Sequence, residues 1–214
     1  MKVGLYFGSF NPVHIGHLII ASHIVEHTEL DQVWFVVSPQ NPFKNNTTLL
    51  NEQHRLALVK IAIEGESKLR ASNAEFQLPK PSYTIDTLTY LSEKYPAHHF
   101  SIIMGSDSYQ NLEQWKNYKQ IIINYNIYVY NRPFFPVKQP VPKNIIIVDA
   151  PLLEISASAI RKDIREGRSI RYLVADDVKI EIEAKGYYRS ALENPPQQDA
   201  TDNNYRGRNF GKPE

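Results

Sequence analysis

The sequence predicts an α/β protein in which an open parallel sheet of about five strands is covered by helices on both faces. Short segments that are almost wholly apolar alternate with segments whose apolar residues recur at helical spacing. The apolar segments lack the polar alternation that a sheet with one face in water requires. The chain is therefore expected to form buried parallel strands connected by helices, with a small helical part near its C-terminal end.

The expected elements follow from local composition and from residues that start and stop helices. The apolar segments predict strands over residues 3–7, 33–37, 100–104, 127–130 and 145–148. Helices are expected from Gly16, after a cap at Asn51, after a cap at Ser82, and over 156–166 and 176–185. We expect residues 1–190 to form one domain. Residues 191–214 are polar and lack periodicity, which predicts a mobile tail.

Composition and charge exclude several classes of protein. The 214 residues include no Cys, so the chain has no disulfide, thiolate zinc site, iron–sulfur cluster or cysteine nucleophile. The 24 Lys and Arg residues balance 23 Asp and Glu residues, which argues against a nucleic-acid-binding surface. No apolar run approaches the roughly 20 residues that cross a bilayer, and none resembles a signal peptide. We expect a cytoplasmic protein that binds neither nucleic acid nor membrane; its oligomeric state is left open.

A loop rich in small residues and histidine follows the first expected strand. It reads GSFNPVHIGH over residues 8–17 and leads into a helix, the kind of junction where open α/β sheets bind ligands. Small residues let backbone N–H groups approach an oxyanion, and a helix N-terminus carries partial positive charge. His14 and His17 can donate hydrogen bonds into the same space. The loop therefore predicts a phosphate site, although it matches neither the P-loop nor GxGxxG.

These histidines have two other interpretations. They could be incidental residues at a helix start, or half of a metal site. A zinc site needs three or four converging ligands, and no carboxylate or further histidine lies nearby in the sequence. The pair His23 and His27 is expected to form a polar helix face. No metal site built from histidine is therefore expected.

A second anion site is predicted at ISASAIR, residues 155–161. Ser156 or Ser158 alone would be interpreted as a helix cap. Arg161 adds a guanidinium that can meet phosphate oxygens. Two anion sites along one sheet edge suit a polyphosphate better than a single carboxylate.

The two segments resemble the GxFxPxHxGH and ISSTxIR motifs of the nucleotidyltransferase superfamily. Three further segments, SPQNPFK (38–44), PSYTIDTL (81–88) and MGSDSYQNLEQWKNY (104–118), resemble those of the bacterial nicotinate-nucleotide adenylyltransferase family. The resemblance extends over residues 1–188 and implies a Rossmann-like fold. It also implies transfer of AMP from ATP to nicotinate mononucleotide, giving deamido-NAD and pyrophosphate. Mg²⁺ would be bound with ATP, without a dedicated protein site.

The resemblance also implies roles for individual residues. Those expected to bind ATP are Gly8, Ser9, Phe10, His17, Gly105, Asp107, Ile155, Ser156, Ser158 and Arg161. The expected catalytic residues are His14, His17, Lys44 and Arg161. The mononucleotide would be bound by Lys44, Tyr83, Thr84 and Trp115. Backbone N–H groups of Tyr83 and Thr84 would receive the nicotinate carboxylate, and Trp115 would stack on the pyridine ring.

Simpler interpretations stay open for three of these residues. Lys44 is also typical of an exposed loop, Trp115 of a core, and Asp107 of a helix cap. The sequence departs from the family motif at Ala157 and Ser158, where the family usually has Ser and Thr. Because Ser158 keeps a hydroxyl, activity is still expected.

Other functions remain as alternatives. The acceptor could be nicotinamide mononucleotide or phosphopantetheine. In a different class, the protein could sense a nucleotide without turning it over. His17 and Arg161 favour the enzyme, because a sensor has no need of groups directed at the leaving pyrophosphate.

Overall fold

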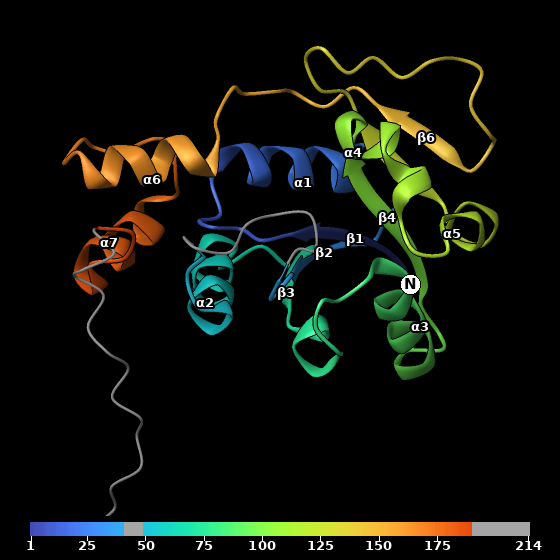
Figure 1. Ribbon diagram of the computed structural model, residues 1–214, viewed down its shortest axis with the longest axis horizontal. Helices are drawn as coiled ribbons and strands as arrows, with labels where there is room; N and C mark the ends of the chain where they lie inside the picture. The colour runs from blue at the N-terminus through green and yellow to red at the C-terminus, as the bar shows by residue number, and fades with distance from the viewer. Residues whose placement is uncertain (41–48, 190–214) are drawn as a thin grey trace, which may run out of the picture.

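The computed structural model describes residues 1–40 and 49–189, and its centre is a six-stranded sheet with the order β3-β2-β1-β4-β5-β6 (Figure 1). All neighbouring strands pair in parallel. The strands are β1 (Lys2–Gly8), β2 (Gln32–Val37), β3 (Leu69–Ser72), β4 (His99–Gly105), β5 (Ile127–Tyr130) and β6 (Ile145–Val148). The predicted open parallel sheet is confirmed.

The sheet has one more strand than the sequence predicted. The strand that was not predicted is β3. It has four residues, of which Arg70 is exposed and Leu69 and Ala71 are half-buried. As an edge strand β3 pairs only with β2, so it needs no continuous apolar run. The guanidinium of Arg70 lies 4.3 Å from the ring centroid of Trp34 on β2, which explains a charged residue within the sheet.

Helices cover both faces of the sheet. They are α1 (Ile15–His27), α2 (Glu52–Ala62), α3 (Thr84–Lys94), α4 (Ser106–Gln110), α5 (Tyr118–Asn124), α6 (Ala157–Arg165) and α7 (Asp176–Lys185), with the 3-10 helices η1 (Ala74–Gln77) and η2 (Leu112–Gln114). Apolar residues of α1, α2, α6 and α7 share one core, and those of α3 and α5 share the other. In Figure 1, α1 lies above the sheet and α3 below it.

The alternation of side chains along each strand produces these two cores. In β1, Tyr6 belongs to the core with α1, whereas Val3 and Leu5 belong to the core with α3. Successive side chains of a strand point to opposite faces, so a strand buried on both faces must be apolar throughout. The uniformly apolar segments of the sequence predict this arrangement correctly.

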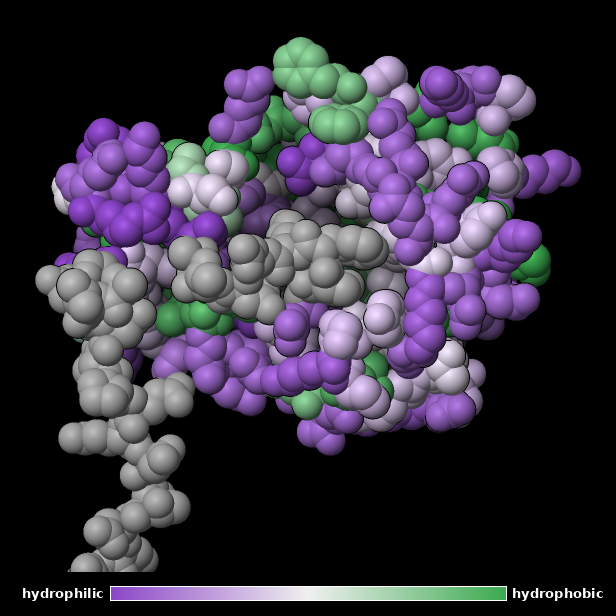
Figure 2. Space-filling view, in the orientation of Figure 1, coloured by the Kyte–Doolittle hydropathy of each residue, from purple (hydrophilic) through white to green (hydrophobic). Residues whose placement is uncertain are grey.

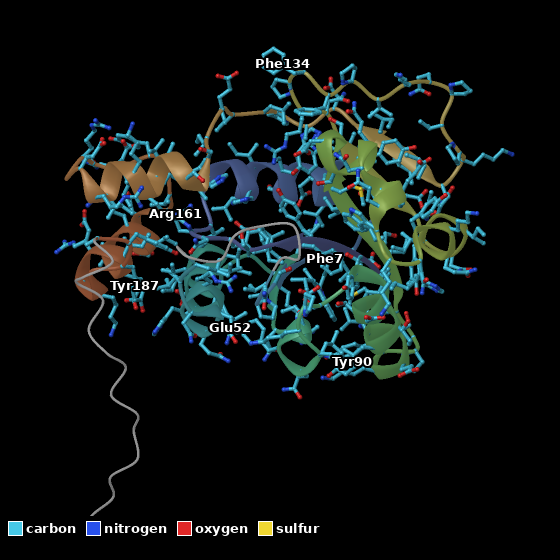
Figure 3. The ribbon with its side chains drawn as sticks, in the orientation of Figure 1. Phe7, Glu52, Tyr90, Phe134, Arg161 and Tyr187 are labelled. Carbon is cyan, nitrogen blue, oxygen red and sulfur yellow. The ribbon has the colours of Figure 1, made fainter. Side chains whose placement is uncertain are left out.

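The C-terminal helical part packs beside the sheet, as expected. Val178 and Ile182 of α7 join the core formed by α1 and α2. The hydroxyl of Tyr187, labelled in Figure 3, lies 2.9 Å from Nδ1 of His54 on α2. This part of the chain is therefore anchored to the sheet through α2.

The predicted helix caps are partly correct. Asn51 caps α2 by accepting from the N–H of Gln53, and Ser156 caps α6 by accepting from the N–H of Ala159. The predicted cap at Ser82 is wrong: Tyr83 occupies the N-cap position of α3, and the Ser82 hydroxyl donates to Glu75 instead. The hydrogen bond to the buried carboxylate directs the Ser82 side chain toward Glu75 of η1.

The segment between β5 and β6 carries the most exposed aromatic side chain described. Phe134 is 94% exposed and has a left-handed φ of 68°. Figure 3 labels it at the upper edge of the molecule, where Figure 2 shows an apolar group above a largely hydrophilic face. Among the described residues, no helix has the length and apolar character needed to cross a membrane.

Candidate active site

A cavity of about 520 Å³ lies where the carboxyl ends of β1, β4 and β5 meet the start of α6. It brings together every predicted site residue that the structure describes: Gly8, Ser9, Phe10, His14, His17, Tyr83, Thr84, Gly105, Asp107, Trp115, Ile155, Ser156, Ser158 and Arg161. The predicted residue Lys44 and the predicted tail 191–214 lie outside the described residues. Segments far apart in the sequence thus converge at one sheet edge, as expected for an open α/β fold.

The loop after β1 forms one wall through its backbone. The ring of Phe10 packs against Gly8 so closely that a Cβ on Gly8 would lie 2.8 Å from it. This ring is 2% exposed and packs on Phe35 at 5.3 Å between centroids. Phe10 thus fixes the loop from the core side, so that backbone groups of residues 8–10 can face a ligand.

The two histidines of the loop lie one above the other. Their ring centroids are 3.6 Å apart at an interplanar angle of 25°. Nδ1 of His17 accepts from the backbone N–H of His14 at 3.2 Å. Because Nδ1 accepts, the proton of a neutral His17 ring resides on Nε2. This contact fixes both the orientation and the tautomer of His17.

His14 is the more buried of the two. Its ring is 8% exposed, and Nδ1 has no hydrogen-bond partner within residues 1–40 and 49–189. Burial, with a smaller contribution from the charge of Arg132, lowers the pKa of His14 to about 4. His14 is therefore neutral near pH 7 and offers an unpartnered polar atom beside the cavity.

Arg161 joins the start of α6 to the loop after β1. Its Nη1 donates to the carbonyl of Asn11 at 2.7 Å, and its Nη2 donates to Oγ of Ser158 at 3.3 Å. Its buried Nε has no partner in the described part of the chain. Figure 3 shows Arg161 beneath α6, on the side of the sheet. One guanidinium thus connects the two predicted anion sites.

Arg132 is a second cation of the cavity, and sequence reasoning missed it. Its Nε lies 3.7 Å from Oδ1 of Asp107, and its Nη2 donates to the Tyr130 hydroxyl at 3.3 Å. Its backbone N–H donates to Oγ of Ser106. Its position in the sequence could have indicated this role, because Arg132 lies two residues beyond β5, at the sheet edge where open α/β folds bind ligands.

Asp107 is not the helix cap that the sequence left open, because Gly105 occupies the N-cap position of α4. The Asp107 side chain turns back toward Gly105 and Arg132 instead. A Cβ on Gly105 would collide with Oδ1 of Asp107, so only glycine admits this close approach. The carboxylate thereby faces the cavity.

The opposite wall is the turn that begins α3. The N-cap residue of α3 is Tyr83, whose backbone is extended. Its side chain does not cap the helix, so the first backbone amides of α3 stay available. Nζ of Lys116 lies 4.9 Å from the ring centroid of Tyr83 and 2.8 Å from Oδ2 of Asp86. Trp115 lines the cavity and also packs, partly buried, on the core with α3, so its contact with the pyridine ring stays a prediction.

Comparisons with known proteins agree with this geometry. A family model described as cytidylyltransferase-like matches residues 5–163, which defines the class of the domain. A probable nicotinate-nucleotide adenylyltransferase of Cytophaga hutchinsonii is 53% identical over 191 residues, covering 88% of this chain and 98% of that protein. One of Flavobacterium johnsoniae is 48% identical over 193 residues, covering 88% and 100%. The chain belongs to the nicotinate-nucleotide adenylyltransferase family within that class.

Solved structures support the fold. The nicotinic acid mononucleotide adenylyltransferase of Plasmodium falciparum, complexed with NaAD, superposes with a TM-score of 0.74 at 20% identity, covering 87% of this chain and 97% of that one. A putative nicotinate-nucleotide adenylyltransferase of Vibrio parahaemolyticus has a TM-score of 0.68 and covers 89% and 97%. The predicted Rossmann-like architecture is therefore shared with these proteins.

Proposed function

We propose that the protein transfers the adenylyl group of ATP to nicotinate mononucleotide, forming deamido-NAD and pyrophosphate in NAD biosynthesis. The observation that carries this proposal is the single cavity that joins two anion-binding segments to the turn at Tyr83 and Thr84. Both substrates are soluble anions, and we place the reaction in the cytoplasm. The residues used here lie within the proposed domain of residues 1–190.

The triphosphate of ATP binds between the loop after β1 and the start of α6. His14, His17 and Arg161 face this space together with the hydroxyls of Ser156 and Ser158. The unpartnered Nδ1 of His14 and Nε of Arg161 find acceptors in phosphate oxygens. Gly8, Ser9, Phe10, Gly105 and Ile155 contribute backbone walls, and Asp107 accepts from a ribose hydroxyl.

The reaction is an in-line displacement at the α-phosphate. An oxygen of the mononucleotide phosphate forms the new bond to this phosphorus while the bond to the bridging oxygen of pyrophosphate breaks. The attacking oxygen is already anionic, so no general base is required. Negative charge moves to the pyrophosphate, where His17 and the guanidiniums of Arg161 and Arg132 stabilise it.

The acceptor is held by the turn at α3. The free amides of Tyr83 and Thr84 bind the nicotinate carboxylate, and Trp115 stacks on the pyridine ring. Lys44 stays a predicted contact of the acceptor phosphate. Holding both anions in line supplies the largest part of the rate enhancement.

Mg²⁺, when bound with ATP, neutralises phosphate charge. The described residues contain no group of three or more His, Asp or Glu side chains that could hold a metal ion. Phosphate oxygens would supply ligands to the ion, and the carboxylate of Asp107, which lies beside Arg132 in the cavity, could contribute another.

The experiment is a measurement of pyrophosphate release from ATP and Mg²⁺ with purified protein. Nicotinate mononucleotide, nicotinamide mononucleotide and phosphopantetheine are compared as acceptors. Fast release with nicotinate mononucleotide alone is expected. Preference for another acceptor would keep the mechanism and replace the substrate, whereas no release with any acceptor would favour a nucleotide sensor.

A further inference from the structure

Glu75 of η1 is a buried carboxylate that none of the roles above uses. The residue is 3% exposed, lines the cavity and forms no ion pair among the described residues. A buried carboxylate without hydrogen bonds strongly destabilises a fold. The Glu75 carboxylate therefore needs hydrogen-bond donors, and packing alone does not explain a charged residue at this position.

Two hydroxyl groups supply those partners. The Ser82 hydroxyl donates to Oε2 of Glu75 at 2.7 Å, and the Thr87 hydroxyl donates to Oε1 at 3.1 Å. Burial raises the pKa of the Glu75 carboxyl, and the nearby polar side chains of Ser82, Ser38 and Thr87 oppose that rise. The carboxyl group thus joins η1 to both sides of the turn that begins α3.

These two contacts enclose the acceptor turn. Ser82 immediately precedes Tyr83, and Thr87 lies in the first turn of α3, so Glu75 holds the turn on both sides. No side chain caps α3, whose N-cap residue is Tyr83. The first amides of the helix therefore stay available to a ligand.

Ser38, just beyond β2, lines the same cavity as Glu75 and is held to its phosphate end. The backbone N–H of Ser38 donates to the carbonyl of Gly8 at 2.9 Å. The fully buried guanidinium of Arg55 donates to the carbonyls of both Ser38 and Ser9. The end of β2 is thus fixed to the loop after β1.

We propose that Glu75 is a positioning residue that holds the turn 82–84 in place and thereby sets the preference for an acceptor whose ring carries a carboxylate. This inference rests on the proposed function, in which the amides of that turn bind the carboxylate. A shift of about 1 Å in these amides would weaken carboxylate binding and leave ATP binding intact.

A matched pair of threonine variants tests this proposal. Thr87→Val removes a hydroxyl that lies 3.1 Å from Oε1 of Glu75 and 3.4 Å from the carbonyl of Tyr83, and the variant Glu75→Gln separates the two contacts. Thr89→Val, the control, removes a hydroxyl of the same helix that donates to the carbonyl of Ile85. For Thr87→Val, we expect the KM of nicotinate mononucleotide to rise about tenfold and the preference over nicotinamide mononucleotide to fall similarly. The KM of ATP stays unchanged, and Thr89→Val matches the wild type.

Glu75→Gln is the second variant, because it keeps the shape of the side chain and removes its charge. It should reproduce the effect of Thr87→Val. Thermal unfolding shows whether Glu75→Gln folds. If it does not, Ser82→Ala, which removes the other hydroxyl that donates to Glu75, replaces it in the same kinetic assay. An unchanged acceptor KM, or an equal loss with both acceptors and with ATP, would overturn the role of Glu75.

The two proposals fail in different ways. A wild-type protein that uses only acceptors lacking the ring carboxylate refutes the proposed function. A wild-type protein with the proposed activity, whose acceptor preference survives Glu75→Gln and Thr87→Val, refutes only the inference about Glu75.

Discussion

The two ends of the cavity satisfy their buried polar groups in different ways. At the phosphate end, formed by residues 8–17 and 155–161, Nδ1 of His14 and Nε of Arg161 have no partner in the described part of the chain. At the acceptor end, formed by residues 82–84 and Trp115, the buried Glu75 receives hydrogen bonds from the hydroxyls of Ser82 and Thr87. Under the proposed function, the ligand completes the phosphate end, whereas the protein preorganises the acceptor end.

This difference teaches what each end can discriminate. Unpartnered polar groups favour a ligand that brings anionic oxygens, so we expect the phosphate end to recognise charge. A turn held by satisfied hydrogen bonds presents its amides in one geometry, so we expect the acceptor end to recognise the position of a carboxylate. Substitutions at the two ends should therefore change different kinetic constants.

The largest expected effect is at the phosphate end. His17→Ala removes a donor to the charge that develops on pyrophosphate, and kcat should fall about 100-fold to 1000-fold with little change in either KM. Steady-state kinetics of pyrophosphate release would measure it. His27→Ala, an exposed site on the same helix, is the matched control. Unchanged turnover would remove His17 from the mechanism.

Arg161→Lys should have the next largest effect. Lysine keeps the positive charge but cannot reach Asn11 and Ser158 as the guanidinium does. The KM of ATP should rise about 10-fold to 100-fold, because charge-assisted contacts to phosphate are lost, while the KM of the acceptor stays within twofold of wild type. Arg165→Lys, exposed on the same helix, provides the comparison. Equal changes in both KM values would contradict the division between the two ends.

Trp115→Ala addresses the acceptor end. Loss of stacking on the pyridine ring should raise the KM of the mononucleotide about tenfold. ATP binding, measured separately by calorimetry, should change little. If the acceptor KM stays the same, Trp115 serves only the core with α3.

The smallest expected effect is on stability. The pKa of His14 is lowered from 6.5 to about 4 in the folded protein, so the unfolded chain binds the proton more tightly. Stability should therefore fall as the pH decreases from about 6.5 to about 4. Between pH 7.5 and 5.5 the loss from this group is about 1 kcal/mol. Thermal unfolding of wild type and His14→Asn would measure it; parallel pH dependences of the two would exclude this origin.

Much of the fold could be predicted because its signals are local. A strand buried on both faces must be apolar, and Asn51 and Ser156 cap helices through contacts within a few residues. The edge strand β3 could not be predicted in this way, because it is short, half exposed and includes a charged residue. Its arginine is accommodated by Trp34 from a neighbouring strand, a contact between distant positions.

The candidate site shows the same limit. The loop 8–17 and the segment 155–161 each combine several informative residues, so the sequence identifies them without coordinates. Glu75 and Arg132 are single charged residues whose positions depend on tertiary contacts with Ser82 and Asp107. The predicted cap at Ser82 failed in a similar way: α3 begins one residue later, at the N-cap Tyr83, and the Ser82 hydroxyl donates to Glu75, seven residues earlier in the chain.

The contact between Arg161 and the carbonyl of Asn11 has a consequence for biosynthesis. All six strands precede residue 149, so a growing chain can complete its sheet before α6 leaves the ribosome. The nucleotide site needs a further segment, because Arg161 must reach back to the loop after β1 and the N–H of Ile15 must donate to the carbonyl of Leu173. We therefore expect a nascent chain to lack the complete proposed ATP site until translation has passed this point.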